Sequence, residues 1–138
     1  MNALIALGIS IISGPNVTDV DVTYRGMVSH FEANLGGSLI NAAKCHEVPD
    51  HYCACRWSES ALCRHLKIDY RDLRETLFRS YRVEVMNPDN GRKAIVVPVD
   101  TGPARWTGRS LDLDKGTLDR LGLKTDDEVL FTLRRRER

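Results

Sequence analysis

The chain has 138 residues, of which 42% are hydrophobic, a size that suits one globular domain burying about two thirds of its unfolded surface. Twenty Lys and Arg residues against nineteen Asp and Glu residues give a formal net charge of +1. The chain therefore lacks the positive field that draws proteins onto nucleic acid, and we expect a single domain over residues 1–138 that does not bind nucleic acid.

The two ends of the chain differ from the rest in composition. Up to Ile12 the first segment is apolar apart from Asn2 and Ser10, but this run is well short of the ~20 residues that span a bilayer. It also lacks the basic start of a signal peptide. We expect no membrane span, and we expect segment 1–16 to pack in the core or against a protein partner. Residues 134–138, RRRER, are expected to form a solvated basic tail.

The first half of the chain contains one clear strand. Apolar and polar residues alternate from Val20, the period-2 pattern of a half-buried strand, which predicts a strand over residues 20–31. Residues 33–50 show little periodicity, and the Cys/His-rich stretch that follows, up to Arg56, is expected to form a loop; together they are read as an insertion. Ser58 is expected to cap a short helix, and Asp69 to begin a second one.

A β-hairpin is predicted in the second half of the chain. Val83 and Val85 alternate with polar residues, Asn90-Gly91 supplies the pair that a two-residue type I′ turn requires, and residues 94–99 are rich in β-branched side chains. Pro98 cannot donate to a strand ladder, so it predicts a strand end or a bulge just before Asp100.

Four further elements are expected after the hairpin. Residues 101–107 are predicted to form a loop and residues 109–113 a strand. Asp114 is expected to cap a helix over residues 115–121, with Gly122 just beyond its end. A last strand is expected over residues 128–133.

The second half also resembles a known family in the order and spacing of several motifs. These are Val83-Glu84-Val85, Asn90-Gly91-Arg92, Ile95-Val96-Val97, Asp100-Thr101-Gly102-Pro103, Gly108-Arg109, Leu111-Asp112-Leu113 and Leu121-Gly122. They resemble the core of the rare-lipoprotein-A-like lytic transglycosylases, which share their barrel with barwin-like and expansin-like domains. The resemblance implies a mainly β fold, a six-stranded double-psi β-barrel. It also implies that the protein cleaves peptidoglycan glycan strands without a cofactor. It also implies an extracytoplasmic location, in the bacterial envelope or on a phage tail.

Asp100 and Asp112 are the candidate catalytic residues. Cleavage of a glycosidic bond needs a carboxyl group whose pKa is raised so that it can protonate the leaving oxygen. Asp100 follows a hydrophobic strand and precedes Gly102, where a glycan could approach the backbone closely. Asp112 lies between two leucines, so strand alternation predicts that it points away from the core. We expect Asp100 to act as acid and then base, with Asp112 as a second carboxyl group; the alternatives are a turn residue for Asp100 and a structural partner of Arg109 for Asp112.

Three other residues are expected to contribute to substrate binding, together with Gly102. Arg109 is expected to orient the two acids or to bind a substrate carboxylate. Trp106 and His30 are expected to line a sugar-binding groove, although each also has a purely structural alternative, as a packing residue and as part of a strand.

Four cysteines form a dense cluster with three histidines. Cys45, Cys53, Cys55 and Cys63 lie within nineteen positions, and we expect two disulfides in which Cys53 and Cys55 each bond to one of the other two. A structural zinc site with the same four cysteines as ligands, or free buried thiols, are the alternatives.

The function expected from these features is cleavage of peptidoglycan by a lytic transglycosylase. The alternative is a barrel without catalytic activity that binds glycan or serves as a structural part of a larger assembly.

Overall fold

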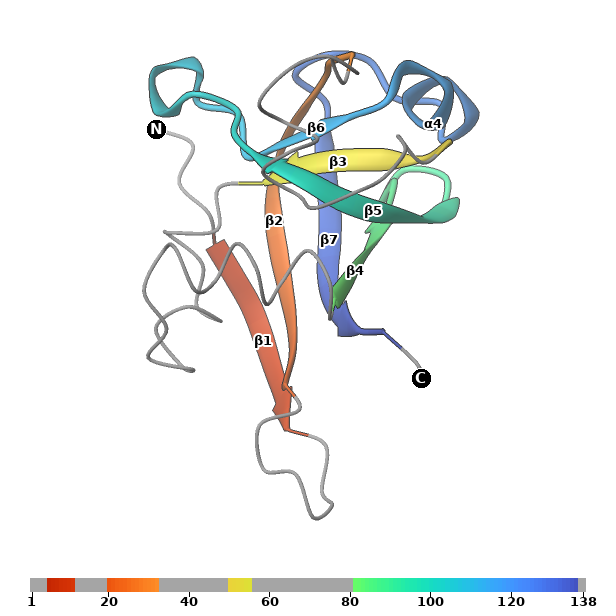
Figure 1. The fold of residues 1–138 in the computed structure, drawn as a ribbon. Helices are drawn as coiled ribbons and strands as arrows, with labels where there is room; N and C mark the ends of the chain where they lie inside the picture. Colours follow the sequence, from red (N-terminus) through yellow and green to blue (C-terminus); the bar gives the residue numbers. More distant parts are fainter. Residues whose placement is uncertain (1–4, 12–19, 33–49, 56–80, 137–138) are drawn as a thin grey trace.

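The computed structural model describes residues 5–11, 20–32, 50–55 and 81–136. Within these residues the chain is mainly β (Figure 1). The elements in chain order are β1 (Ile5–Ile11), β2 (Val20–His30), β3 (Tyr52–Cys55), β4 (Tyr81–Met86), β5 (Lys93–Thr101), the 3₁₀ turn η2 (Arg105–Thr107), β6 (Leu111–Leu113), α4 (Lys115–Arg120) and β7 (Glu128–Arg135). The two helices expected to begin at Ser58 and Asp69 lie outside the described residues.

Six of the strands close a barrel. Their order is β2–β6–β3–β5–β4–β7, and β7 pairs back onto β2. The β2–β6 and β3–β5 pairs are parallel, whereas the other pairs around the barrel are antiparallel. A closed barrel leaves its six strands without an unpaired edge along most of their length. The prediction that the chain is mainly β and forms a closed six-stranded barrel is thus confirmed.

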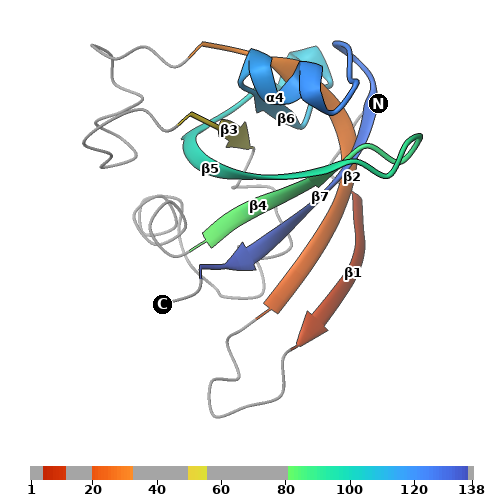
Figure 2. The same cartoon turned by 90° about the vertical axis from the view of Figure 1, so that its right-hand side faces the viewer.

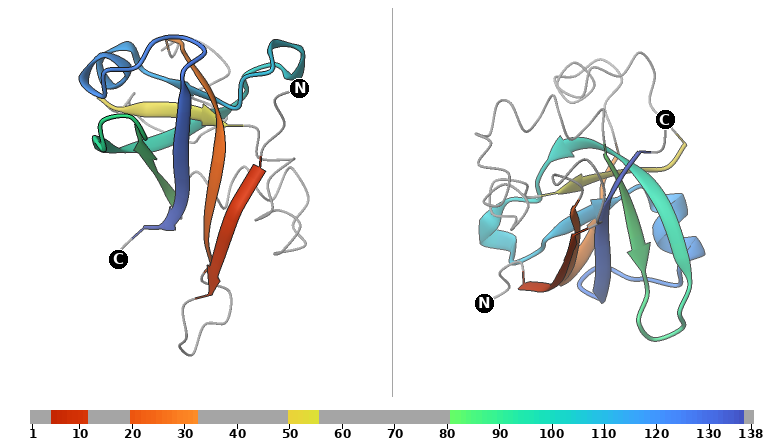
Figure 3. Two further views of the ribbon diagram at one scale, coloured as in Figure 1. Left: turned by 180° about the vertical axis from the view of Figure 1, so that it is seen from behind. Right: turned by 90° about the horizontal axis from the view of Figure 1, so that it is seen from below.

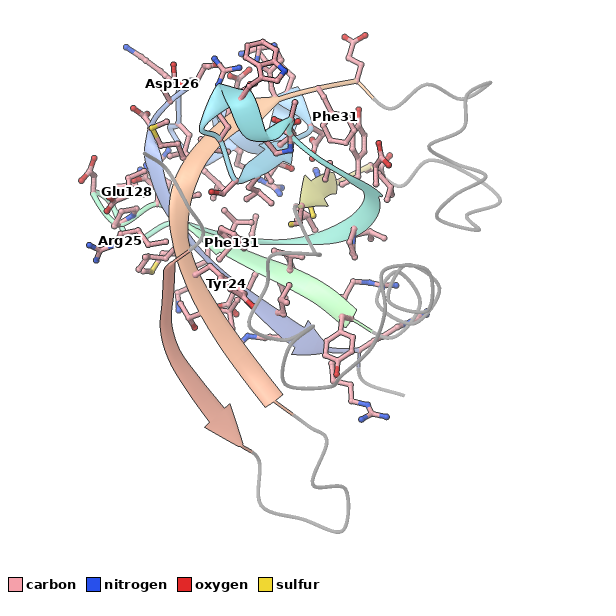
Figure 4. All side chains as sticks on the ribbon, turned by 90° about the vertical axis from the view of Figure 1, so that its left-hand side faces the viewer. Tyr24, Arg25, Phe31, Asp126, Glu128 and Phe131 are labelled. Atoms are coloured by element: carbon pink, nitrogen blue, oxygen red, sulfur yellow. The ribbon has the colours of Figure 1, made fainter. Side chains whose placement is uncertain are left out.

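The alternation expected from the sequence fills the barrel interior. In β4, β6 and β7 every second residue is buried, including Val83 and Val85 on β4 and Leu111 and Leu113 on β6. Tyr24 of β2 stacks on Phe131 of β7 with ring centroids 5.3 Å apart, and Figure 4 shows the two rings together between these strands. Aromatic and aliphatic side chains from facing strands therefore form one continuous core.

The apolar N-terminal segment adds a strand to the chain's own sheet. β1 pairs antiparallel with the first half of β2, from Ile5 opposite Arg25 to Ile11 opposite Val20. Figures 2 and 3 show β1 running beside β2, with α4 at the other end of the barrel. The second half of β2 pairs with β6 instead, so β2 is long enough to pair with β1 along its first half and with β6 along its second.

The hairpin is present, but the predicted two-residue turn is wrong. Met86 pairs with Lys93, so the connection spans residues 87–92, and Gly91 but not Asn90 has a positive φ. The side-chain amides of Asn87 and Asn90 donate to the carbonyl oxygen of Leu121 at 2.9 and 3.0 Å. Because these bonds tie the loop to the end of α4, the tertiary contact favours a wider loop than the local pair of residues suggested.

The predicted cap of the short helix is confirmed. The Asp114 carboxylate accepts a hydrogen bond from the Thr117 backbone N–H at 2.9 Å, and Gly122 beyond the last turn has a φ of +72°. Asp114 also accepts from the backbone N–H of Tyr52 at 3.0 Å. One carboxylate therefore starts α4 and joins it to β3.

Three smaller expectations need correction. The strand predicted over residues 109–113 is shorter, Leu111–Leu113, because Ser110 bonds to Met27 outside the regular ladder. The Cys/His-rich segment was predicted to be a loop, but Tyr52–Cys55 within it form β3, a barrel strand paired on both sides. The basic tail was predicted to begin at residue 134, but Arg134 lies in β7 and its guanidinium binds both carboxylate oxygens of Glu84, at 3.0 and 3.4 Å.

Candidate functional site

The two candidate catalytic acids lie in one row across the barrel wall. Asp112 of β6 is in register with Ala54 of β3, and Ala54 is in register with Asp100 of β5. On the other side of Asp112, Ser29 of β2 continues the row. Residues in register on neighbouring strands project on the same side of a sheet. Asp112 and Asp100 therefore flank Ala54, with backbones about 10 Å apart at two strand spacings.

A β-bulge brings Asp100 into this row. Cys53 pairs with Pro98 and Ala54 with Asp100, so Val99 is an extra residue in β5. Bulges bend a strand and change the direction of the side chains that follow. Of the strand end or bulge predicted from Pro98, the structure has the bulge, and without it Val99, not Asp100, would lie beside Ala54.

The carboxyl group of Asp112 has a raised pKa. Burial is the largest cause that raises the pKa of this half-buried carboxyl group, to about 6 from the usual 3.8. The charge of Asp100 raises this pKa further, whereas the charges of Arg109 and His30 lower it. Three other residues singled out from the sequence, Asp100, Arg109 and His30, therefore act electrostatically on Asp112.

Arg109 has a partner that sequence reasoning missed. Its Nε donates to Oδ1 of Asp126 at 2.9 Å, and this hydrogen bond lowers the pKa of Asp126 and raises that of Arg109. Figure 4 shows Asp126 at the same end of the barrel as Phe31, which follows β2. The turn-like Thr125-Asp126-Asp127 sequence was a signal for this acid, but nothing local indicated that it would meet Arg109.

The other three residues expected to bind substrate are Gly102, Trp106 and His30, and the structure places each in a different environment. Gly102 has a φ of +152°, and a Cβ placed on it would lie 4.0 Å from the Cβ of Ala54, so its backbone passes beside the row. Trp106 in η2 is 88% exposed, which excludes the core-packing alternative in this structure. His30 is exposed at the end of β2, where it lines a pocket beside α4.

Two of the four cysteines differ from the disulfide prediction. Cys53 and Cys55 are free thiols, both buried, with their sulfur atoms 4.0 Å apart. They lie on the core side of β3, in register with Leu113 and Leu111, where cysteine packs as a small hydrophobic residue. Burial, more than any other effect, raises the pKa of the Cys55 thiol well above its usual value. Cys45 and Cys63, the other expected disulfide or zinc residues, lie outside the described residues.

Two negative observations complete the description of the site. Among the described residues, no three His, Cys, Asp or Glu side chains are grouped as metal ligands. No helix in the described part of the chain is long and apolar enough to cross a membrane.

Comparison of the chain with protein-family models, curated proteins and solved structures found no match.

Proposed function

We propose that this barrel cleaves peptidoglycan glycan strands as a lytic transglycosylase with double-psi topology. The observation that supports the proposal most is the carboxyl group of Asp112, whose pKa is raised to about 6 beside a second acid, Asp100. A carboxyl group with a pKa in this range is partly protonated near neutral pH and can therefore donate a proton to a leaving oxygen. The motifs shared with rare-lipoprotein-A-like enzymes contain both acids and support the same activity.

The proposed reaction uses one carboxyl group twice. Asp112 donates its proton to the glycosidic oxygen as the bond to C1 of the muramyl residue breaks. The muramyl 6-hydroxyl oxygen then bonds to C1, and its proton passes to the Asp112 carboxylate, which restores the acid and leaves a 1,6-anhydro product. The Asp100 carboxylate adds a little to the pKa of Asp112, which burial mainly raises, and it can stabilise the positive charge that develops at C1.

This assignment reverses the roles expected from the sequence, where Asp100 was the acid. Asp112 is now the proton donor because burial raises its pKa. The activity would require an extracytoplasmic location, in the bacterial envelope or on a phage tail that opens the wall.

The test is to incubate the protein with purified peptidoglycan and to measure anhydromuramyl products by mass spectrometry. We expect Asp112→Asn to lower the rate by about 10² to 10⁴, because an amide cannot deliver the proton. We expect the wild-type rate to fall above pH 6 as Asp112 ionises. Asp89→Asn, in the exposed hairpin loop, is the matched control and should keep the wild-type rate.

Two results would contradict this proposal in different ways. Full activity in Asp112→Asn combined with none in Asp100→Asn would return the acid role to Asp100. If wild-type protein forms no anhydromuramyl product, the enzyme proposal fails.

A barrel that binds glycan without cleaving it is the second candidate, and the exposure of Trp106 favours it. An indole that is 88% exposed can stack on a sugar ring without first leaving the core. For this candidate we expect Trp106→Ala to reduce co-sedimentation with insoluble peptidoglycan while the free energy of unfolding stays unchanged. Equal co-sedimentation of variant and wild type would remove Trp106 from any glycan-binding role.

A further inference from the structure

Asp126 binds Arg109 beside the proposed catalytic acids, and backbone hydrogen bonds fix both residues on β2. The N–H of Asp126 donates to the carbonyl oxygen of Val28 at 2.8 Å. The N–H of Ser110, which follows Arg109, donates to the carbonyl oxygen of Met27 at 2.9 Å. Figure 4 shows Asp126 at the end of the barrel that also carries η2. The 2.9 Å hydrogen bond from Nε of Arg109 to Oδ1 of Asp126 therefore joins two anchored segments of the chain.

The backbone at position 126 does not require an acid. Asp126 has a φ of +74°, a left-handed conformation that glycine adopts with less strain. The side chains of Arg109 and Asp126 are 30% and 56% exposed, and ion pairs this exposed contribute little to stability. An acid at this position can hold the guanidinium group in one place, however, and a glycine cannot.

The position of Arg109 matters because its charge acts on Asp112. Burial has the largest effect on the pKa of Asp112 and raises it, and among the neighbouring charges that of Arg109 has the largest effect and lowers it. His30 at the end of β2 also lowers this pKa, and Asp100 on β5 raises it. The charge of Asp112 acts in turn on the Cys55 thiol of β3. A group that offsets the charge of Arg109 therefore changes how readily Asp112 ionises.

We propose that Asp126 is a positioning residue of this site, which holds the guanidinium group of Arg109 on its own carboxylate and so limits the effect of Arg109 on Asp112. This inference rests on the proposed function, because it takes Asp112 as the proton donor. Without the Asp126 carboxylate, the full charge of Arg109 favours the ionised form of Asp112, which has no proton to donate. Asp126 therefore extends the pH range in which Asp112 can act toward neutral pH.

The experiment follows ionisation of the Asp112 carboxyl group by NMR titration of the whole chain, with the signal assigned through Asp112→Asn. In Asp126→Asn we expect the titration midpoint to fall by about half a pH unit, less than for a close ion pair because solvent screens Arg109. In Arg109→Gln the midpoint should rise, and the combined variant should titrate as Arg109→Gln does, because Asp126 acts through Arg109. Asp119→Asn is the matched control: its exposed carboxylate also binds a basic side chain, that of Lys115, and this variant should titrate as wild type.

The same shift should appear in the rate of peptidoglycan cleavage. A fall of about half a pH unit in the midpoint lowers the protonated fraction of Asp112 at pH 7 about threefold. We therefore expect Asp126→Asn to be about threefold slower than wild type at pH 7 and nearly as fast at pH 5. Circular dichroism at both pH values checks that the variant stays folded, since a purely structural defect would lower the rate without moving the midpoint.

The outcomes separate this inference from the proposed activity. An unchanged or higher midpoint in Asp126→Asn, or a combined variant that titrates well below Arg109→Gln, would overturn the positioning role even if wild type cleaves peptidoglycan. An Arg109→Gln midpoint no higher than that of wild type would overturn it as well, and this variant leaves the turn at Asp126 intact. The expected midpoints in a protein that forms no anhydromuramyl product would support the control of Asp112 by Asp126 and overturn the activity.

Discussion

Replacing Asp112 with Asn should stabilise the protein at neutral pH. The pKa of this carboxyl group rises from 3.8 to about 6 on folding, mainly because burial disfavours its charged form. At about 1.36 kcal/mol per pH unit this difference sets an upper limit of about 3 kcal/mol. Because Asp112 is only half-buried, solvent screens its charge and we expect a gain of about 1–2 kcal/mol in the free energy of unfolding.

The sign of this effect determines its pH dependence. Below the unfolded-state pKa of 3.8 the carboxyl group is protonated in both states, so wild type and Asp112→Asn should be equally stable. Between pH 4 and 6 the unfolded chain ionises more readily than the folded one, and wild type loses stability relative to the variant. Above about pH 6 the difference should stay constant.

Urea unfolding of both proteins from pH 3.5 to 8, followed by circular dichroism, measures this difference. Asp126→Asn is a control of opposite sign: the hydrogen bond from Arg109 lowers the pKa of Asp126, so this variant should be less stable than wild type at neutral pH, with the loss disappearing in acid. Asn also tolerates the positive φ of 74° at this position. If Asp112→Asn is no more stable than wild type at pH 7, burial does not disfavour its charge, and the main argument for Asp112 as the proton donor is lost.

Two further predictions concern packing and the cysteines. Gly26→Ala would place a Cβ 2.5 Å from both Cβ and Oγ of buried Ser110, and we expect it to lower the free energy of unfolding in urea by about 1–3 kcal/mol; an unchanged value would show that β2 and Ser110 move apart freely. Cys53 and Cys55 should resist alkylation in the native protein and react in denaturant without a reductant, as judged by peptide mass spectrometry; detection of either residue in a disulfide-linked peptide would contradict the free thiols.

Local sequence patterns determined the elements that depend on neighbouring residues. The alternation from Val20 predicted β2, because one face of that strand packs on the core and the other does not. Asp114 and Gly122 predicted both ends of α4, since a cap depends on only a few residues. Pro98 predicted a strand end or a bulge before Asp100, since proline lacks the N–H that a regular ladder uses, and the structure has the bulge.

Only the tertiary structure decided how distant segments meet. Tyr52–Cys55 is a short segment with no polar alternation, and it becomes a strand because β5 and β6 pair with it on either side. The same pairing aligns Asp112, Ala54 and Asp100, three residues from separate strands whose register no local pattern encodes. The raised pKa of Asp112 follows mainly from burial and, to a smaller extent, from the charge of Asp100, because desolvation and neighbouring charges exist only once the barrel has closed.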